Sequence, residues 1–271
     1  MSAPSNIRNN YEEVLPGIYS LVPNEVYHQS EGLSKTDLTD IVDYSIATYQ
    51  MRKNNPPRPT DPMIKGSAFH DLVLLPDEYK KNYLVGPTVS RSTKKWKEVA
   101  ADNPDCIIIT PGMSDDIHYM RDALYKNPTI RSILESDTIL REVSIWQTDP
   151  STSFIVKIRP DIITDGIIFD LKSTNSPHAK GFIHSVWKYS YHMQAAYYQY
   201  VATLNGMSIS DFQFLVVGSK PPYLTAIYNL SDEVYNEGHD KFREALDIYN
   251  NYLHSDDKWD GLYYGRETVT L

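Results

Sequence analysis

Hydrophobic and polar residues alternate along residues 153–174, which read SFIVKIRPDIITDGIIFDLKST. Val156 and Ile158 fall on one face of a strand, and the charged residues beside them fall on the other. Asp165-Gly166 is typical of a two-residue hairpin loop, because a type I′ turn needs positive φ at both central positions. The pattern predicts a half-buried β-hairpin in the middle of the chain.

The register of this hairpin brings two carboxylates together. If Asp165 and Gly166 form the loop, counting back along both strands places Asp161 opposite Asp170 and Arg159 opposite Lys172. Carboxylates on neighbouring strands have Cβ atoms about 5 Å apart and repel each other unless a positive group lies between them. Oxygen ligands suit Mg²⁺ or Mn²⁺, and Lys172 can reach a water or a phosphate oxygen there. A solvated strand face with alternating charges is the alternative.

Periodicity and capping residues predict the elements around the hairpin. Ser34 and Asp37 resemble a capping box that opens a helix, and Ser231 caps another. The predicted helices cover residues 34–42, 44–51, 61–75, 114–134, 190–204 and 231–253. The predicted strands cover residues 18–21, 106–110, 140–147, 212–218 and 223–230.

Two of these helices carry candidate site residues. In the 61–75 helix, His70 follows Gly66 by one turn, and the missing side chain of Gly66 would let another backbone come close. The helical pattern alone leaves His70 either a hydrogen-bonded core residue or a metal ligand. In the 190–204 helix, Gln194 and Tyr198 are four residues apart and share a face.

Basic residues surround a tryptophan in the sequence VSRSTKKWK at 89–97. Arg91, Lys94 and Lys95 can bind phosphates, and Trp96 can stack on an unpaired base. A solvated helix start with one half-buried tryptophan is an equal alternative.

Composition sets wide limits. The chain has 271 residues, of which 41% are hydrophobic and 12% aromatic, so it can bury a substantial core. Cys106 is its one cysteine, which excludes a disulfide framework and suits a reducing cytoplasm. No secretion signal or membrane span is predicted. The net charge of −9 argues against DNA binding unless the cations are concentrated on one surface.

Several motifs together resemble a known family. The sequence Arg159-Pro160-Asp161 followed by Asp170-Leu171-Lys172 is similar to the PD-(D/E)xK nuclease core. More specifically, the chain resembles the phage and prophage exonucleases of the RecE (exonuclease VIII) type, which are relatives of the RecB nuclease domain and of lambda exonuclease. The resemblance covers about residues 17–263 and rests on GLSKTDL (32–38), KGSAFHDLVLLP (65–76), REVSIW (141–146), KIRPD with FDLKST, and HMQAAYY (192–198).

The resemblance implies roles for individual residues. His70, Asp161, Asp170 and the Leu171 carbonyl would hold metal, with Glu142 in the same active site. Lys172 would position and polarise the attacking water, and Gln194 and Tyr198 would line the site. Lys65, Arg91 and Arg159 are further candidates for phosphate contacts.

The resemblance also implies an overall fold and activity. We expect an α+β restriction-endonuclease-like fold with a central mixed sheet flanked by helices, built as one domain over residues 1–271. Residues 1–12 would be a loose tail, 13–100 a helical part and 101–271 the nuclease core. The implied activity is Mg²⁺-dependent 5′–3′ degradation of one strand of linear duplex DNA, leaving 3′ overhangs for recombination.

The same resemblance implies partners for the chain. The expected partners are duplex DNA ends, further copies in a ring, favoured as a tetramer, and a single-strand annealing protein of the RecT type. A related endonuclease or single-strand nuclease, and an inactive DNA-end-binding module, are the alternatives.

Overall fold

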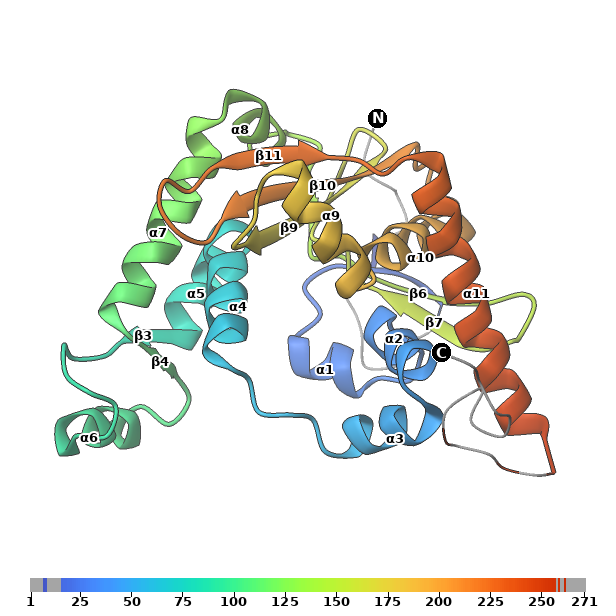
Figure 1. Ribbon diagram of the computed structural model, residues 1–271, viewed down its shortest axis with the longest axis horizontal. Helices are drawn as coiled ribbons and strands as arrows, with labels where there is room; N and C mark the ends of the chain where they lie inside the picture. Colours follow the sequence, from blue (N-terminus) through green and yellow to red (C-terminus); the bar gives the residue numbers. More distant parts are fainter. Residues whose placement is uncertain (1–6, 9–15, 257, 259–260, 262–271) are drawn as a thin grey trace.

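A computed structural model describes residues 7–8, 16–256, 258 and 261 of the chain (Figure 1). The helices are α1 Asn24–Gln29, α2 Lys35–Asp43, α3 Ile46–Asn54, α4 Asp61–Leu74, α5 Pro76–Asn82, α6 Lys94–Asp102, α7 Pro111–Lys126, α8 Pro128–Leu134, α9 Ala179–Lys188, α10 Tyr191–Leu204 and α11 Asp232–His254. The strands are β1 Ile7–Arg8, β2 Gly17–Tyr19, β3 Tyr83–Val85, β4 Ile107–Ile109, β5 Leu140–Arg141, β6 Ser144–Thr148, β7 Ile155–Ile158, β8 Ile162–Thr164, β9 Ile167–Thr174, β10 Asp211–Gly218 and β11 Thr225–Tyr228.

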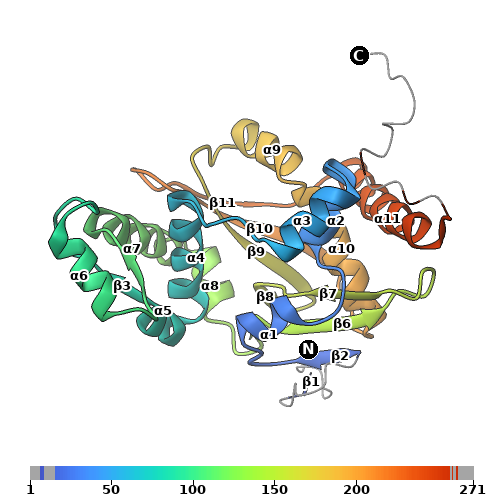
Figure 2. The same cartoon turned by 90° about the horizontal axis from the view of Figure 1, so that it is seen from below.

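A mixed five-stranded sheet forms the centre of the molecule, in the order β11-β10-β9-β8-β5. Strands β9 and β10 are parallel, whereas β8 and β11 run antiparallel to their neighbours. Helices cover both faces of the sheet (Figures 1 and 2). The fold is therefore the predicted α+β arrangement with a mixed sheet between helices.

Alternating side chains on β9 and β10 fill two hydrophobic cores. Phe169 and Leu171 pack with α4 and α7 on one face of the sheet. Ile168 and Phe214 pack on the other face with α2, α10 and α11. Because side chains on successive strand residues point to opposite faces, β9 contacts the helices of both layers.

The predicted hairpin forms in the predicted register, with Thr164 paired to Ile167 and Ile162 paired to Phe169. Continuing this register by one residue puts Asp161 opposite Asp170. Asp165 and Gly166 both have positive φ, as the two-residue turn requires.

A bend before the hairpin corrects two predictions. The first strand of the predicted hairpin is interrupted at Arg159-Pro160-Asp161. The part after the interruption is β8 of the central sheet, whereas the part before it is β7, which belongs to a second sheet of order β1-β2-β6-β7. Arg159 therefore does not face Lys172. The predicted strand 140–147 is likewise broken between β5 and β6, where Glu142 has a φ of 51°.

Other boundaries also differ from the prediction. The helix expected from Ser114 begins at Pro111, because Thr110 rather than Ser114 caps it. Residues 1–12 were expected to form a loose tail. Two of them, Ile7 and Arg8, form β1 and pair with β2, and residues 1–6 and 9–12 lie outside the described part of the chain. The short strand β4 pairs in parallel with β3 and carries an exposed Ile107, so it is not fully buried.

The strands β3 and β4 and the helix α6 lie at the opposite end of the molecule from α11 (Figure 2). Within the part of the chain that the structure describes, no helix combines the length and the apolar character needed to cross a membrane.

Candidate active site and metal centre

Two carboxylates come from the bends that join the two sheets. Glu142 lies between β5 and β6, and Asp161 lies between β7 and β8. The Glu142 amide donates a 3.1 Å hydrogen bond to the Asp161 carbonyl, so the two bends are held side by side. A positive φ is unfavourable for glutamate and recurs at functional sites, where the surrounding structure maintains it.

Helix α4 adds His70 to these carboxylates. Pro62 lies in the first turn of α4, where its missing N–H costs nothing, and the helix packs Phe69 into the core while the next residue, His70, contacts the two bends. His70 Nε2 is 2.9 Å from Asp161 Oδ2 and 3.6 Å from Glu142 Oε1. One ligand atom from each of the three residues lies within 4.8 Å of the other two.

Charges in this cluster are strongly coupled. Burial disfavours the charged form of His70, but the Asp161 carboxylate outweighs it and raises the pKa of His70 to about 10. Burial raises the pKa of Glu142 to about 7, although His70 opposes this. A cation bound here would take the place of the His70 proton, because a ligating imidazole must be neutral.

Asp170 is the third carboxylate of the site, and it is almost fully buried on β9. Its Oδ2 forms an ion pair with Lys172 Nζ at 2.6 Å, in a geometry that is not that of a hydrogen bond. Gln194 on α10 bridges the pair, because its Nε2 donates to Asp170 Oδ1 at 2.5 Å and its Oε1 accepts from Lys172 Nζ at 3.2 Å. Burial and the nearby Asp161 raise the pKa of Asp170 to about 6.

The remaining predicted residues lie around this pair. The Leu171 amide donates to Asp161 Oδ2 at 2.7 Å, which fixes that carboxylate against β9, and a role for the Leu171 carbonyl as a ligand stays a prediction. The Tyr198 ring is held edge-on by Phe212 at 6.2 Å. Burial raises the pKa of Tyr198 well above its ordinary value, and Asp170, Asp161 and Glu142 act in the same direction.

Three of the predicted DNA contacts serve inside the protein instead. Trp96 is 7% exposed, so its ring is not available to stack on a base. Arg159 donates to Ser144 Oγ and to the Val22 carbonyl, and it covers the Tyr27 ring at 4.2 Å. Lys65 is partly buried and pairs with Asp116 and the Ser219 carbonyl.

The other predicted phosphate contacts lie at the surface. Arg91 is 41% exposed and pairs with Asp61. Lys94 is 91% exposed and Lys95 is exposed, so both stay candidates for phosphate binding. Sequence spacing alone did not separate these surface cations from Lys65 and Arg159, because contacts with residues distant in sequence decide which cations are buried.

Comparison with known families decides the class. A family model described as a PDDEXK-like domain of unknown function (DUF3799) matches residues 43–259, which is most of the chain. The chain belongs to this family. The match confirms the PD-(D/E)xK part of the resemblance, whereas the RecE type stays a prediction. As a member of this family, the chain is a nuclease of the PD-(D/E)xK class.

A solved structure agrees with this one at the level of the fold. The crystal structure of a candidate exonuclease from Eubacterium rectale superimposes with a TM-score of 0.61 at 14% identity, covering 92% of this chain and 94% of that one. An alkaline exonuclease from Laribacter hongkongensis gives a TM-score of 0.30 at 13% identity over 60% of this chain and 84% of that one, which is too distant to inform the fold. A search of curated proteins found no match.

One residue of the PDDEXK-like site was missed from the sequence. Tyr191 covers Lys172, whose Nζ lies 4.4 Å from the centre of the ring. Tyr191 precedes Gln194 by three residues, so helical spacing places both on neighbouring faces of α10 and gave a usable signal.

Proposed function

We propose that the protein is a Mg²⁺-dependent exonuclease that degrades one strand of linear duplex DNA from its 5′ end. The single observation that carries this proposal is the cluster of His70, Glu142 and Asp161 beside the Asp170–Lys172 pair. The resemblance to RecE-type exonucleases supports the direction and the preference for ends. The 3′ overhang left behind would serve recombination, with a RecT-type annealing protein as partner.

The donor set fits a hard divalent cation. Glu142 Oε1 is buried and has no hydrogen-bond partner among the described residues, and Asp170 Oδ2 has only the Lys172 ammonium beside it. Three carboxylates and one imidazole suit Mg²⁺ or Mn²⁺, and the absence of a thiolate disfavours a structural zinc site. We assign His70, Asp161, Asp170 and Glu142 as the residues that would hold the cation. When bound, it would polarise the phosphodiester and make water a better nucleophile.

Lys172 and Gln194 act on the reacting groups in this proposal. Asp170, Gln194 and the Tyr191 ring fix the Lys172 ammonium at one position. From there Lys172 would donate a hydrogen bond to the attacking water or to a phosphate oxygen. Positioned donors of this kind are effective because they are already oriented before the transition state forms.

The test compares three forms of DNA. Linear duplex labelled at either end, covalently closed circular duplex and single-stranded DNA are incubated with Mg²⁺ or with EDTA. We expect loss of nucleotides from the 5′ end of linear duplex with Mg²⁺, and no cutting of closed circles. Cutting of closed circles would favour the related endonuclease, and binding without any cleavage would favour the inactive end-binding module.

A further inference from the structure

A second lysine lies beside the active-site lysine. Lys35, the first residue of α2, and Lys172 both approach the ring of Tyr191, at 5.9 Å and 4.4 Å from its centre. Lys35 Nζ donates to the Tyr189 carbonyl at 2.6 Å. The Tyr189 ring lies 5.6 Å from the Tyr191 ring and is 48% exposed.

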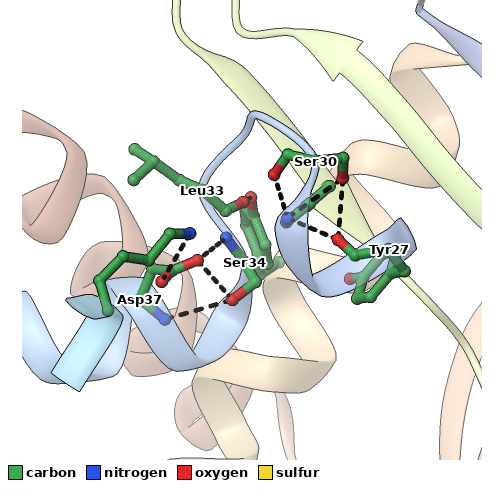
Figure 3. A network of polar contacts seen from close by, with 8 residues as sticks. Tyr27, Ser30, Leu33, Ser34 and Asp37 are labelled. Atoms are coloured by element: carbon green, nitrogen blue, oxygen red, sulfur yellow. Dashed lines mark hydrogen bonds and ion pairs between the residues drawn. The ribbon is translucent and has the colours of Figure 1, made fainter. Parts of the chain in front are cut away.

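The loop before α2, whose residues Leu33 and Ser34 are shown with Asp37 in Figure 3, is held by polar contacts on both sides. Leu33 is bridged to β7, since its amide donates to the Ile155 carbonyl at 2.8 Å and its carbonyl accepts from the Lys157 amide at 2.9 Å. Tyr197 of α10 donates to the same carbonyl at 2.6 Å. A reciprocal capping box between Ser34 and Asp37 then starts the helix. Lys35 is thus held by contacts to both a strand and a helix of the core.

The turn that carries Tyr189 is held equally firmly. Ser190 is fully buried and has a φ of 52°, a conformation that an L-residue adopts at a cost. Its hydroxyl donates to Asp43 Oδ2 at 2.9 Å and accepts from Lys241 Nζ at 2.9 Å. These contacts between α2, α10 and α11 keep the Tyr189 carbonyl on Lys35 and leave the Tyr189 ring at the surface.

The charges of the two lysines differ. Lys172 is paired with Asp170, but no carboxylate of the described residues lies within 4 Å of Lys35 Nζ. Burial, and after it the nearby Lys172, lowers the pKa of Lys35 to about 7. An anion beside Lys35 would restore its charged form. The same place therefore offers a lysine without a carboxylate partner among the described residues and an exposed aromatic ring.

We propose that Lys35 and Tyr189 form a nucleotide subsite next to the cleaved phosphodiester, where Lys35 binds a backbone phosphate and Tyr189 stacks on an unpaired base. This inference rests on the proposed nuclease function. Lysine is a common phosphate ligand, and stacking of an aromatic ring on a base tolerates any sequence. The subsite would hold the substrate strand after it separates from its complement.

Stacking of Tyr189 on a base is tested by measuring DNA binding in EDTA, where no cleavage takes place. Duplexes with a short unpaired end carry the fluorescent base 2-aminopurine at each position of that strand in turn. We expect quenching on binding at one position near the end, retained by Tyr189→Phe and lost in Tyr189→Ala, with affinity reduced about 10-fold. Tyr119→Ala is the matched control, because Tyr119 is 57% exposed and stacks on Tyr223 instead.

The phosphate half is tested with neutral methylphosphonate linkages placed one at a time. Wild-type protein should lose affinity at the linkage beside the quenched base, whereas Lys35→Gln, already weakened, should lose no more there. Unfolding temperatures of all variants check that they are folded. If the wild type cleaves DNA, but wild type, Tyr189→Ala and Lys35→Gln show the same quenching and the same affinities, the subsite is overturned and the proposed function is not. Absence of both binding and cleavage by the wild type would overturn the proposed function and the subsite with it.

Discussion

At the level of single residues, most of the acidic groups in the site have a cationic partner from another element. His70 from α4 lies against Asp161, and Lys172 lies against Asp170. Glu142 is the exception, because its Oε1 is buried and His70 is 3.6 Å away. A buried carboxylate without a donor costs free energy, so Glu142 is the group that gains most from a bound cation.

This imbalance predicts that Glu142→Gln separates stability from metal binding. Without metal, the variant should unfold at the same temperature as wild type or a few degrees higher, because it removes a buried carboxylate oxygen that accepts no hydrogen bond from the described part of the chain. Addition of Mn²⁺ should raise the unfolding temperature of wild type but not of the variant, since only binding to the folded state stabilises it. Thermal unfolding with Mn²⁺ or EDTA measures both effects. An equal metal-induced shift in the two proteins would show that Glu142 is not a ligand.

At the level of elements, local signals predicted most of the fold. The Asp165-Gly166 turn set the hairpin register, and Ser34 and Ser231 mark helix starts because capping depends on neighbours in sequence. The bends at Glu142 and Pro160 were not predictable, since pairing with distant strands decides where a strand leaves one sheet for another. Arg159 was misplaced for the same reason. The Trp96 ring is buried because it packs closely against Gly86, ten residues earlier in the chain, and the local sequence does not show this contact.

Two helical glycines should respond in opposite ways to alanine. A Cβ at Gly238 on α11 would lie 2.2 Å from the His192 carbonyl oxygen of α10, so the helices would have to separate. We expect Gly238→Ala to lower the free energy of unfolding by about 3 kcal/mol, as overpacking does. The atom nearest to a Cβ added at Gly66 would be Ser173 Oγ, at 4.0 Å. Among the residues that the structure describes, no other backbone comes close to Gly66, so the predicted close approach is wrong.

Gly66→Ala should accordingly gain about 0.5–1 kcal/mol from helix propensity. Urea denaturation of both variants gives the two values. Equal effects of the two substitutions would contradict the helix packing described for α10 and α11.

Asp149 ties the β6–β7 turn to two helices and should make stability depend on pH. Burial alone would raise its pKa, but hydrogen bonds from Tyr200, Ser151, Thr152 and Arg243 hold the pKa well below its usual range. The carboxylate therefore stabilises the fold above the unfolded-state pKa of about 3.9, and this is lost as pH falls towards the folded-state pKa.

Replacement of this carboxylate gives a measurable difference. Asp149→Asn should cost about 2–3 kcal/mol at pH 7, since it leaves Arg243 without its partner. The difference from wild type should shrink below pH 4. A difference that is constant from pH 7 to pH 3, measured by denaturant unfolding, would show that the carboxylate charge contributes nothing.

At the level of the whole molecule, a chain of net charge −9 must bring DNA to an acidic site. Lys94 and Lys95 on α6 are exposed, as is Lys180 on α9, so cations come to the surface from more than one element. A ring of several copies would enclose DNA with such surfaces. We predict a closed oligomer, favoured as a tetramer, in light scattering at micromolar concentration. A mass of one chain under these conditions would count against the ring.

The central claim, that Asp161, Asp170 and Lys172 with His70 form a nuclease active site, is tested most directly by one substitution. Hydrolysis of linear duplex DNA is measured for wild type and Lys172→Met, with the exposed Lys180→Met as control. We predict that wild type and Lys180→Met cleave only with Mg²⁺ or Mn²⁺, and that Lys172→Met is slower by about 100-fold or more while binding DNA equally well. Undiminished cleavage by Lys172→Met would contradict the account.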